Sequence, residues 1–88
     1  MKHYYENVPE LGNVAVSRHA QDRIREDGIT DKEFEDALFK GELIPDTHEA
    51  SFRDLNRIRL VIIHRPEPFK GAKLIKTAFR IQAQKRAY

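Results

Sequence analysis

The fold is decided by two stretches, RIRLVIIH at residues 57–64 and KLIKTAFRIQ at residues 73–82. Both are rich in β-branched residues, which favour strands over helices. The first becomes apolar at every position toward its end, a pattern typical of a strand that is covered on both faces. We therefore expect two paired β-strands at the centre of the fold, and the segments before them must cover their apolar side.

The second stretch alternates strictly, so successive side chains point to opposite faces of the sheet. The face predicted to enter the core carries Ile75, Thr77, Phe79 and Ile81. The other face carries Leu74, Lys76, Ala78, Arg80 and Gln82. Arg57 and Arg59 on the first stretch extend this second face, so the sequence predicts an open sheet face with a row of cations.

Composition indicates one small domain. The 88 residues leave no room for a second core, so we expect a single domain over residues 1–88, with an N-terminal arm at 1–12 and a frayed tail at 83–88. No apolar run approaches the roughly 20 residues of a membrane span, and MKHYYE is no signal peptide. We expect a cytoplasmic protein with no membrane partner. Absence of Cys excludes disulfides and thiolate metal sites.

Charge is distributed unevenly along the chain. Residues 1–50 carry 6 Lys/Arg and 12 Asp/Glu, whereas residues 51–88 carry 10 and 2. One interpretation is a strongly positive surface that attracts phosphate backbones through counterion release. The other is that basic strands lie under acidic helices and the two halves neutralise each other. Composition alone leaves both interpretations open.

Two helices are predicted from their ends. Ser17 is a good N-cap and Gly28 a natural stop, which gives a helix between them with Ala20 and Ile24 on its buried stripe. Thr30 and Glu33 form a capping box for a second helix, which ends at Gly41. The short Gly-Ile-Thr connection predicts a tight helical hairpin.

The strands that follow complete the predicted fold. A short strand at residues 43–44 and another at 50–55 precede the two central stretches. Residues 4–11 read as a short strand or an extended arm, and 13–16 as a short strand or a lead-in. The sequence thus predicts an α+β fold with two N-terminal helices packed on one face of a three- to four-stranded antiparallel sheet. The predicted core consists of Ala20, Ile24, Phe34, Leu38, Leu60, Ile62, Ile75, Phe79 and Ile81.

The sequence lacks the motifs of metal-binding, nucleotide-binding and α/β-hydrolase sites. His3, His19, His48 and His64 do not have the spacing of metal ligands, and no H-E-x-x-H occurs. Phosphate-binding and dinucleotide-binding glycine motifs are also absent, as is the nucleophile elbow G-x-S-x-G. We therefore expect no metal and no cofactor.

RNA cleavage without a metal remains possible, since it needs only a base, an acid and cations beside the phosphate. His19 and Arg23 lie four residues apart and share one helix face. The candidate catalytic residues are His19, Arg23, Thr77 and Arg80, and the candidate nucleic-acid-binding residues are Arg57, Arg59, His64 and Lys76. Each also has a structural interpretation. His19 lies beside the apolar stripe of its helix and can bond to a backbone carbonyl. Arg23 can pair with Asp22 or Asp27, and cations on a strand often form a solvated face.

The stretch SRHAQDRIREDGIT at residues 17–30 resembles the opening of a family of small bacterial and phage domains of unknown function. Its members read S-[KR]-H-A-x-x-R, then G-I-[ST], then an acidic helix ending in Gly; KTAFR at 76–80 fits their last strand. That family is similar to the barnase–EndoU–colicin–RelE group of RNase toxins. The resemblance implies a RelE- or barnase-like fold in which His19 and Arg23 face Arg59, Lys76, Thr77 and Arg80.

Two function classes follow. One is a toxin-like, metal-independent endoribonuclease, with RNA as substrate and an acidic antitoxin or immunity protein as a further partner. The other is a non-catalytic module of phage or plasmid type that docks on nucleic acid or on a host protein through its basic sheet face. An enzyme should enclose His19 and the strand cations in one concave site, whereas a docking module should spread them over a flat face.

Overall fold

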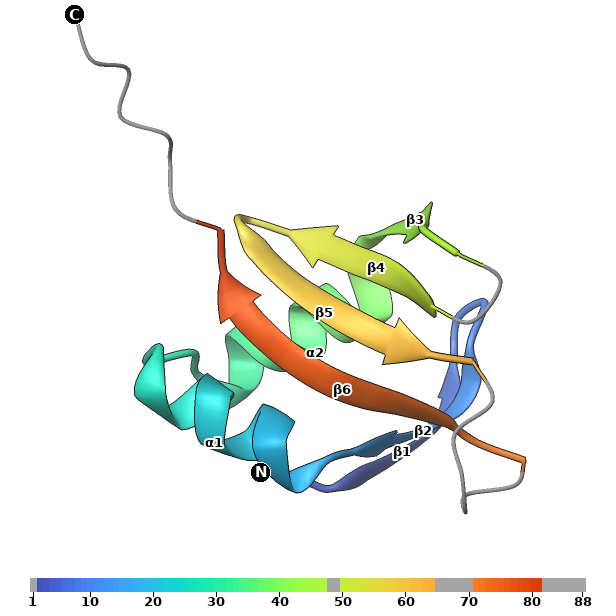
Figure 1. The fold of residues 1–88 in the computed structure, drawn as a ribbon, viewed down its shortest axis with the longest axis horizontal. Helices are drawn as coiled ribbons and strands as arrows, with labels where there is room; N and C mark the ends of the chain where they lie inside the picture. The colour runs from blue at the N-terminus through green and yellow to red at the C-terminus, as the bar shows by residue number, and fades with distance from the viewer. Residues whose placement is uncertain (1, 48–49, 65–70, 82–88) are drawn as a thin grey trace, which may run out of the picture.

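The computed structural model describes residues 2–47, 50–64 and 71–81. Two helices pack on one face of a six-stranded sheet (Figure 1). The elements in chain order are β1 (Tyr4–Val8), β2 (Gly12–Val16), α1 (Arg18–Glu26), α2 (Asp31–Lys40), β3 (Glu42–Pro45), β4 (Ala50–Leu55), β5 (Ile58–Ile63) and β6 (Lys73–Arg80). Among the described residues, no helix has both the length and the apolar character of a membrane span.

The sheet is mixed and curls into a half-barrel around the helices (Figure 1). Its strand order is β1-β2-β6-β5-β4-β3, and β2 pairs with β6 in parallel while every other pair is antiparallel. The predicted three- to four-stranded antiparallel sheet was therefore wrong. Residues 4–8 and 12–16 form a hairpin that adds two strands beside β6.

The hairpin turn explains why this part of the sheet was missed. Pro9 and Gly12 read as interruptions of a strand, but they belong to the turn, in which Leu11 N donates to Val8 O at 3.0 Å. Glu10 and Gly12 both have positive φ, 68° and 74°. Positive φ is uncommon for a residue with a side chain, so the tight turn could not be predicted at Glu10.

Both helices were predicted correctly from their caps. Ser17 Oγ accepts a hydrogen bond from Ala20 N at 3.0 Å and starts α1. Thr30 and Glu33 form the capping box of α2, with bonds of 3.1 Å from Glu33 N to Thr30 Oγ1 and 3.0 Å from Thr30 N to Glu33 Oε1. Gly28 follows α1 with φ 65°, a conformation that favours glycine.

A β-bulge at Lys76 reverses the predicted faces of the last strand. Val61 pairs with Thr77 and Ile62 pairs with Ile75, so Lys76 is an extra residue on β6. One extra residue shifts the alternation by one position. The strict alternation predicted for residues 73–82 was therefore wrong.

The bulge changes which apolar residues enter the core. Ile75 and Ala78 are both fully buried, while Phe79 lies on the opposite face and is partly buried. Of the predicted core, the members confirmed as buried are Ala20, Ile24, Phe34, Leu38, Leu60, Ile62 and Ile75. Phe79 and Ile81 are only partly buried, so their prediction as core residues was wrong. Gln82 lies outside the described residues, as does the tail predicted to fray.

The face of the sheet turned away from the helices is more apolar than predicted. We call it the open face; its large apolar side chains, all partly buried or exposed, are Tyr4, Ile44, Phe52, Val61, Ile63, Leu74 and Phe79. In Figure 1 it faces the viewer, with α2 behind it and α1 beside the edge of β6. Two of its polar residues, Asp54 and Arg59, pair with each other. A row of cations along this face was therefore a wrong prediction.

Candidate nucleic-acid interface

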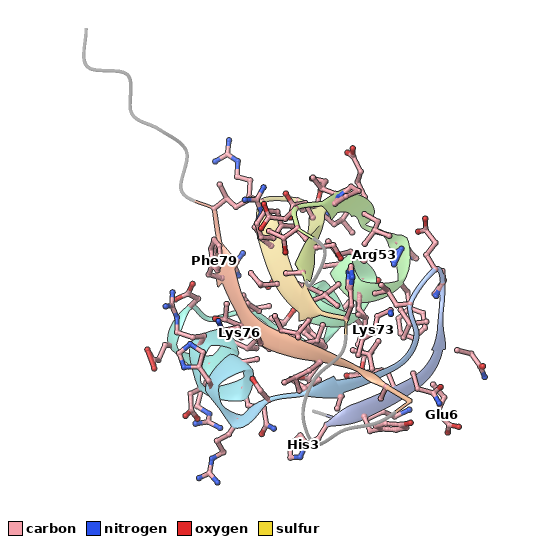
Figure 2. All side chains as sticks on the ribbon, turned by 45° about the vertical axis from the view of Figure 1, so that its right-hand side comes forward. His3, Glu6, Arg53, Lys73, Lys76 and Phe79 are labelled. Atoms are coloured by element: carbon pink, nitrogen blue, oxygen red, sulfur yellow. The ribbon has the colours of Figure 1, made fainter. Side chains whose placement is uncertain are left out.

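Ser17 joins three elements at one point. Its backbone N donates to Ile75 O at 3.1 Å, and its hydroxyl donates to Lys76 O at 2.9 Å while capping α1. The start of α1 is therefore fixed against the bulge of β6, where β2 ends. Figure 2 shows Lys76 beside α1. We call this junction the seam and define it by Arg18, His19 and Lys76.

The seam carries positive charge at the end of the helix that has no acidic residue in its first turn. The side chains of Arg18, His19 and Lys76 are exposed and have no side-chain partner among the described residues. The first turn of α1 contains no acidic residue. Unpaired N–H groups and the helix macrodipole add a partial positive charge at that end. The seam is therefore suited to an anion such as a phosphate group.

Two further predicted residues adjoin the seam. Arg23 lies one turn beyond His19, and its Nη2 is 3.7 Å from Asp27 Oδ2. Because its side chain is 39% exposed, this long contact contributes little and can be exchanged for another anion. Thr77 follows Lys76 and lies on the open face opposite Val61.

Arg80 is held away from the seam by the turn between the helices. Its Nη1 and Nη2 donate to the two carboxylate oxygens of Glu33 at 3.1 and 2.9 Å. Its Nε donates to Asp27 O at 3.1 Å, and Nη2 also donates to Gly28 O at 3.0 Å. The hydrogen bonds from Arg80, followed by that from the Thr30 backbone, lower the pKa of Glu33 from 4.5 to about 2. This geometry braces the α1–α2 turn and leaves little of the guanidinium for a ligand.

Arg59 is also bound to other side chains of the sheet. Its Nε and Nη2 donate to Asp54 at 3.0 and 2.8 Å, and its guanidinium carbon lies 4.3 Å from the centre of the Phe52 ring. Hydrogen bonding with Asp54 raises the pKa of Arg59 further, so the pair stays ionised. A basic sheet face is therefore not formed, because Asp54 neutralises Arg59 and Arg80 lies on the helix side.

The other two predicted binding residues lie apart from the seam. Arg57 is exposed in the β4–β5 turn with φ 66°, and its carbonyl accepts from Ile81 N. His64 Nε2 lies 2.8 Å from the buried Ser51 Oγ at the end of β5. Thus α1 and β6 bring together His19, Lys76 and their neighbours Arg23 and Thr77, but not Arg57, Arg59, His64 or Arg80.

A separate pocket of about 300 Å³ lies between α1, the α1–α2 turn and the start of the chain. It is lined by His3, Gln21, Ile24, Arg25, Ile29 and Asp31, and so contains none of the eight predicted site residues. Within the described ranges, no group of three or more His, Asp and Glu side chains is placed to hold a metal ion.

Two residues were missed by sequence reasoning. Arg18 was not selected, although its place directly after an N-cap with no acidic residue in the first turn could have indicated it. Ser17 was recognised only as a cap. Its bonds to Ile75 O and Lys76 O depend on a bulge that sequence does not reveal.

The seam lies within the part of the chain that has a recognisable family. The family described as "Domain of unknown function (DUF4258)" matches residues 16–80. The chain belongs to this family. The match runs from the end of β2 to the end of β6, so it includes Ser17, Arg18, His19 and Lys76 but leaves out β1. No curated protein and no solved structure matches this DUF4258 chain significantly.

Proposed function

We propose that this DUF4258 domain binds the phosphate backbone of RNA at the seam formed by Arg18, His19 and Lys76. The supporting observation is that these three residues flank the Ser17 cap at the start of α1 and that their exposed side chains have no side-chain partner among the described residues. A phosphate that binds there breaks no ion pair between described residues. Its hydrogen bonds to Arg and Lys are charge-assisted and therefore strong.

Three other arginines are less suited to a phosphate, because each is already bonded within the protein. Arg80 would lose Glu33 and two backbone carbonyls on binding a phosphate, and Arg59 would lose Asp54. Arg53 donates to Glu10 and two carbonyls from a buried position. RNA is favoured over DNA because residues 17–30 resemble the opening of a family that is itself similar to the RNase-toxin group.

The test compares two double variants with the same loss of charge. Arg18→Gln/Lys76→Gln removes two seam cations, whereas Lys32→Gln/Lys40→Gln removes two exposed lysines of α2 that pair with Asp36. Affinity for single-stranded RNA is measured over a range of salt. The seam variant should lower the slope of log affinity against log salt by about 1.4, or 0.7 for each phosphate contact.

The α2 variant should leave that slope unchanged. Equal slopes in both variants, or no binding of RNA by the wild type, would exclude the seam as a phosphate-binding surface.

Cleavage of the bound RNA is the second candidate, favoured by the place of His19 directly after Arg18 in the first turn of α1, whose cap Ser17 bonds to Lys76 O. Histidine ordinarily titrates near neutral pH and is suited to proton transfer. His19 would take the proton of a ribose 2′-hydroxyl, the 2′-oxygen would bond to phosphorus, and the phosphorus–O5′ bond would break as the leaving O5′ takes up a proton from water. Arg18 and Lys76 would stabilise the added negative charge on the phosphate.

The test for cleavage is incubation with RNA in EDTA, followed by mapping of the ends. Cleavage by this route leaves 2′,3′-cyclic or 3′ phosphates, and His19→Ala should lower the rate by about 10²- to 10⁴-fold. RNA that binds at the seam but stays intact would identify a non-catalytic docking module. Full activity of the His19→Ala variant would assign the proton transfer elsewhere.

A further inference from the structure

The open face carries two flat groups on neighbouring strands. Phe79 on β6 and Arg59 on β5 are direct partners across the antiparallel pair. Both are partly exposed, the Arg59 side chain by 29%. We call them the Phe79–Arg59 row. Aromatic rings and guanidinium planes are the groups on which proteins stack unpaired bases.

Building on the proposed phosphate binding, we propose that the Phe79–Arg59 row stacks unpaired bases and makes the domain select single-stranded over double-stranded RNA. Phosphates would lie on the seam, and the bases of the same strand would lie on the adjoining sheet face. In a duplex the base faces are already stacked on each other, so they are not available to the row.

The Arg59 plane is prepared for stacking by its neighbours. Asp54 accepts from Nε at 3.0 Å and from Nη2 at 2.8 Å, which fixes the edge of the guanidinium. Phe52 lies 4.3 Å below it and covers one face. Because the Arg59 side chain is still 29% exposed, we expect its other face to receive a base without loss of either contact. A held plane loses less conformational entropy on binding than a free side chain.

The bulge connects the row with the seam. Because Lys76 is the extra residue of β6, Phe79 turns to the open face instead of the core. Lys76 and Phe79 lie three residues apart on one strand, about 10 Å at the usual rise. A nucleotide chain bound at Lys76 therefore reaches Phe79 within a few nucleotides. Figure 2 shows Lys76 and Phe79 along the same strand.

The salt dependence of affinity distinguishes stacking on the Phe79–Arg59 row from phosphate binding at the seam. Asp54 neutralises Arg59, so stacking adds affinity without adding counterion release. Phe79→Leu should lower the affinity for single-stranded RNA of mixed sequence by about 5- to 100-fold. The salt slope and the affinity for the same strand annealed to its complement should not change.

The experiment needs two more variants. Arg59→Lys keeps the charge but loses the plane, and it should also weaken single-strand binding at constant salt slope. Tyr4→Leu removes the exposed ring of β1, which lies on the open face away from the row, and should have no effect. Thermal unfolding of each variant establishes that the fold is intact.

The outcomes separate this proposal from the one on which it rests. Wild-type affinity in both Phe79→Leu and Arg59→Lys, with a lowered slope in the seam variant, would overturn stacking and leave phosphate binding in place. Equal affinity for single strand and duplex would also overturn it. No RNA binding at all would overturn both proposals. Self-association through the open face, seen by ultracentrifugation and abolished by Phe79→Leu while RNA binding is unaffected, would assign the row to a protein contact.

Discussion

Arg53 and Glu10 form an ion pair of 2.6 Å between β4 and the β1–β2 turn, although the Arg53 side chain is only 2% exposed. The same guanidinium donates from Nε to Gly41 O at 3.1 Å and from Nη1 to Pro9 O at 2.8 Å. Figure 2 labels Arg53 within the fold. One buried side chain thus binds the N-terminal hairpin to the end of α2 and satisfies two carbonyls.

Replacement of Arg53 by Ala should lower the free energy of unfolding by about 2–5 kcal/mol, because packing is lost and the carbonyls of Gly41 and Pro9 lose their donor. Urea unfolding measures the change. Arg57→Ala, at an exposed turn position, should stay within about 0.5 kcal/mol of the wild type. A loss below about 1 kcal/mol for Arg53→Ala would show that the hairpin is held by other contacts.

Replacement of Ser17 by Ala should lower the free energy of unfolding more than replacement of Thr30 by Ala. Each residue caps a helix, a contribution of about 0.5–2 kcal/mol. Ser17 Oγ also donates to Lys76 O, which adds about 0.5–1 kcal/mol. Chemical denaturation of Ser17→Ala and Thr30→Ala gives the difference. A smaller loss for Ser17→Ala would mean that the bulge does not depend on this hydroxyl.

Two phenylalanines on opposite faces of the sheet should respond differently to truncation. Phe34 is fully buried, so Phe34→Ala should lower the free energy of unfolding by about 3–5 kcal/mol. Phe79 lies on the open face, so Phe79→Ala should cost less than about 1.5 kcal/mol. Equal losses in urea unfolding would place Phe79 in the core and refute the bulge at Lys76.

Glu33 should make stability depend on pH in the acid range. Its pKa is about 2 in the folded protein, against an ordinary 4.5, mainly because Arg80 hydrogen-bonds its ionised form. A lowered folded-state pKa stabilises the fold above pH 4.5, and this contribution is lost as the pH falls toward 2. Urea midpoints of wild type and Glu33→Gln should therefore differ most at neutral pH and converge in acid.

Asp36, whose pKa is also lowered, chiefly by its hydrogen bond from Lys32, is present in both proteins and cancels in that comparison. A constant difference between the two midpoints from neutral pH to pH 2 would show that Arg80 does not act through the ionised carboxylate of Glu33.

Local signals were enough for the two helices and for the strand at residues 50–55. Ser17, Thr30 and Gly41 mark helix ends by the backbone conformation or hydrogen bond that each supplies, and these depend only on near neighbours. The strand at residues 50–55 was predicted with the bounds that the structure has. Such features need no knowledge of distant residues, so the sequence could specify them.

Features that depend on distant partners were not predictable in this way. Ala78 enters the core when Lys76 is bulged, and Phe79 would enter it in a regular strand. Both residues are apolar, so the sequence pattern fits either register. Arg80 looked like a solvated cation, but its partners Asp27 and Glu33 lie in the helical hairpin. The parallel pairing of β2 with β6 joins segments that share no local pattern.

The candidate site was predictable only in part, because its residues come from segments that are distant in the sequence. His19 stands out as a titratable residue beside a helix cap, and Lys76 as a strand cation. That the Ser17 hydroxyl both accepts from Ala20 N and donates to the Lys76 carbonyl, and so joins the start of α1 to Lys76, follows only from the fold.

The pairing of β2 with β6 also has a consequence for synthesis of the chain on the ribosome. β2 and α1 are made early, yet both pack against β6, the last strand described. Such non-local contacts raise the contact order and slow folding. Until residue 80 has left the ribosomal exit tunnel, one edge of β2 has no neighbour and the stripe of α1 formed by Ala20 and Ile24 has no strand to cover. A nascent chain that stalls before β6 would therefore expose apolar surface to chaperones and proteases, and α1 and β2 would complete their packing only after β6 emerges.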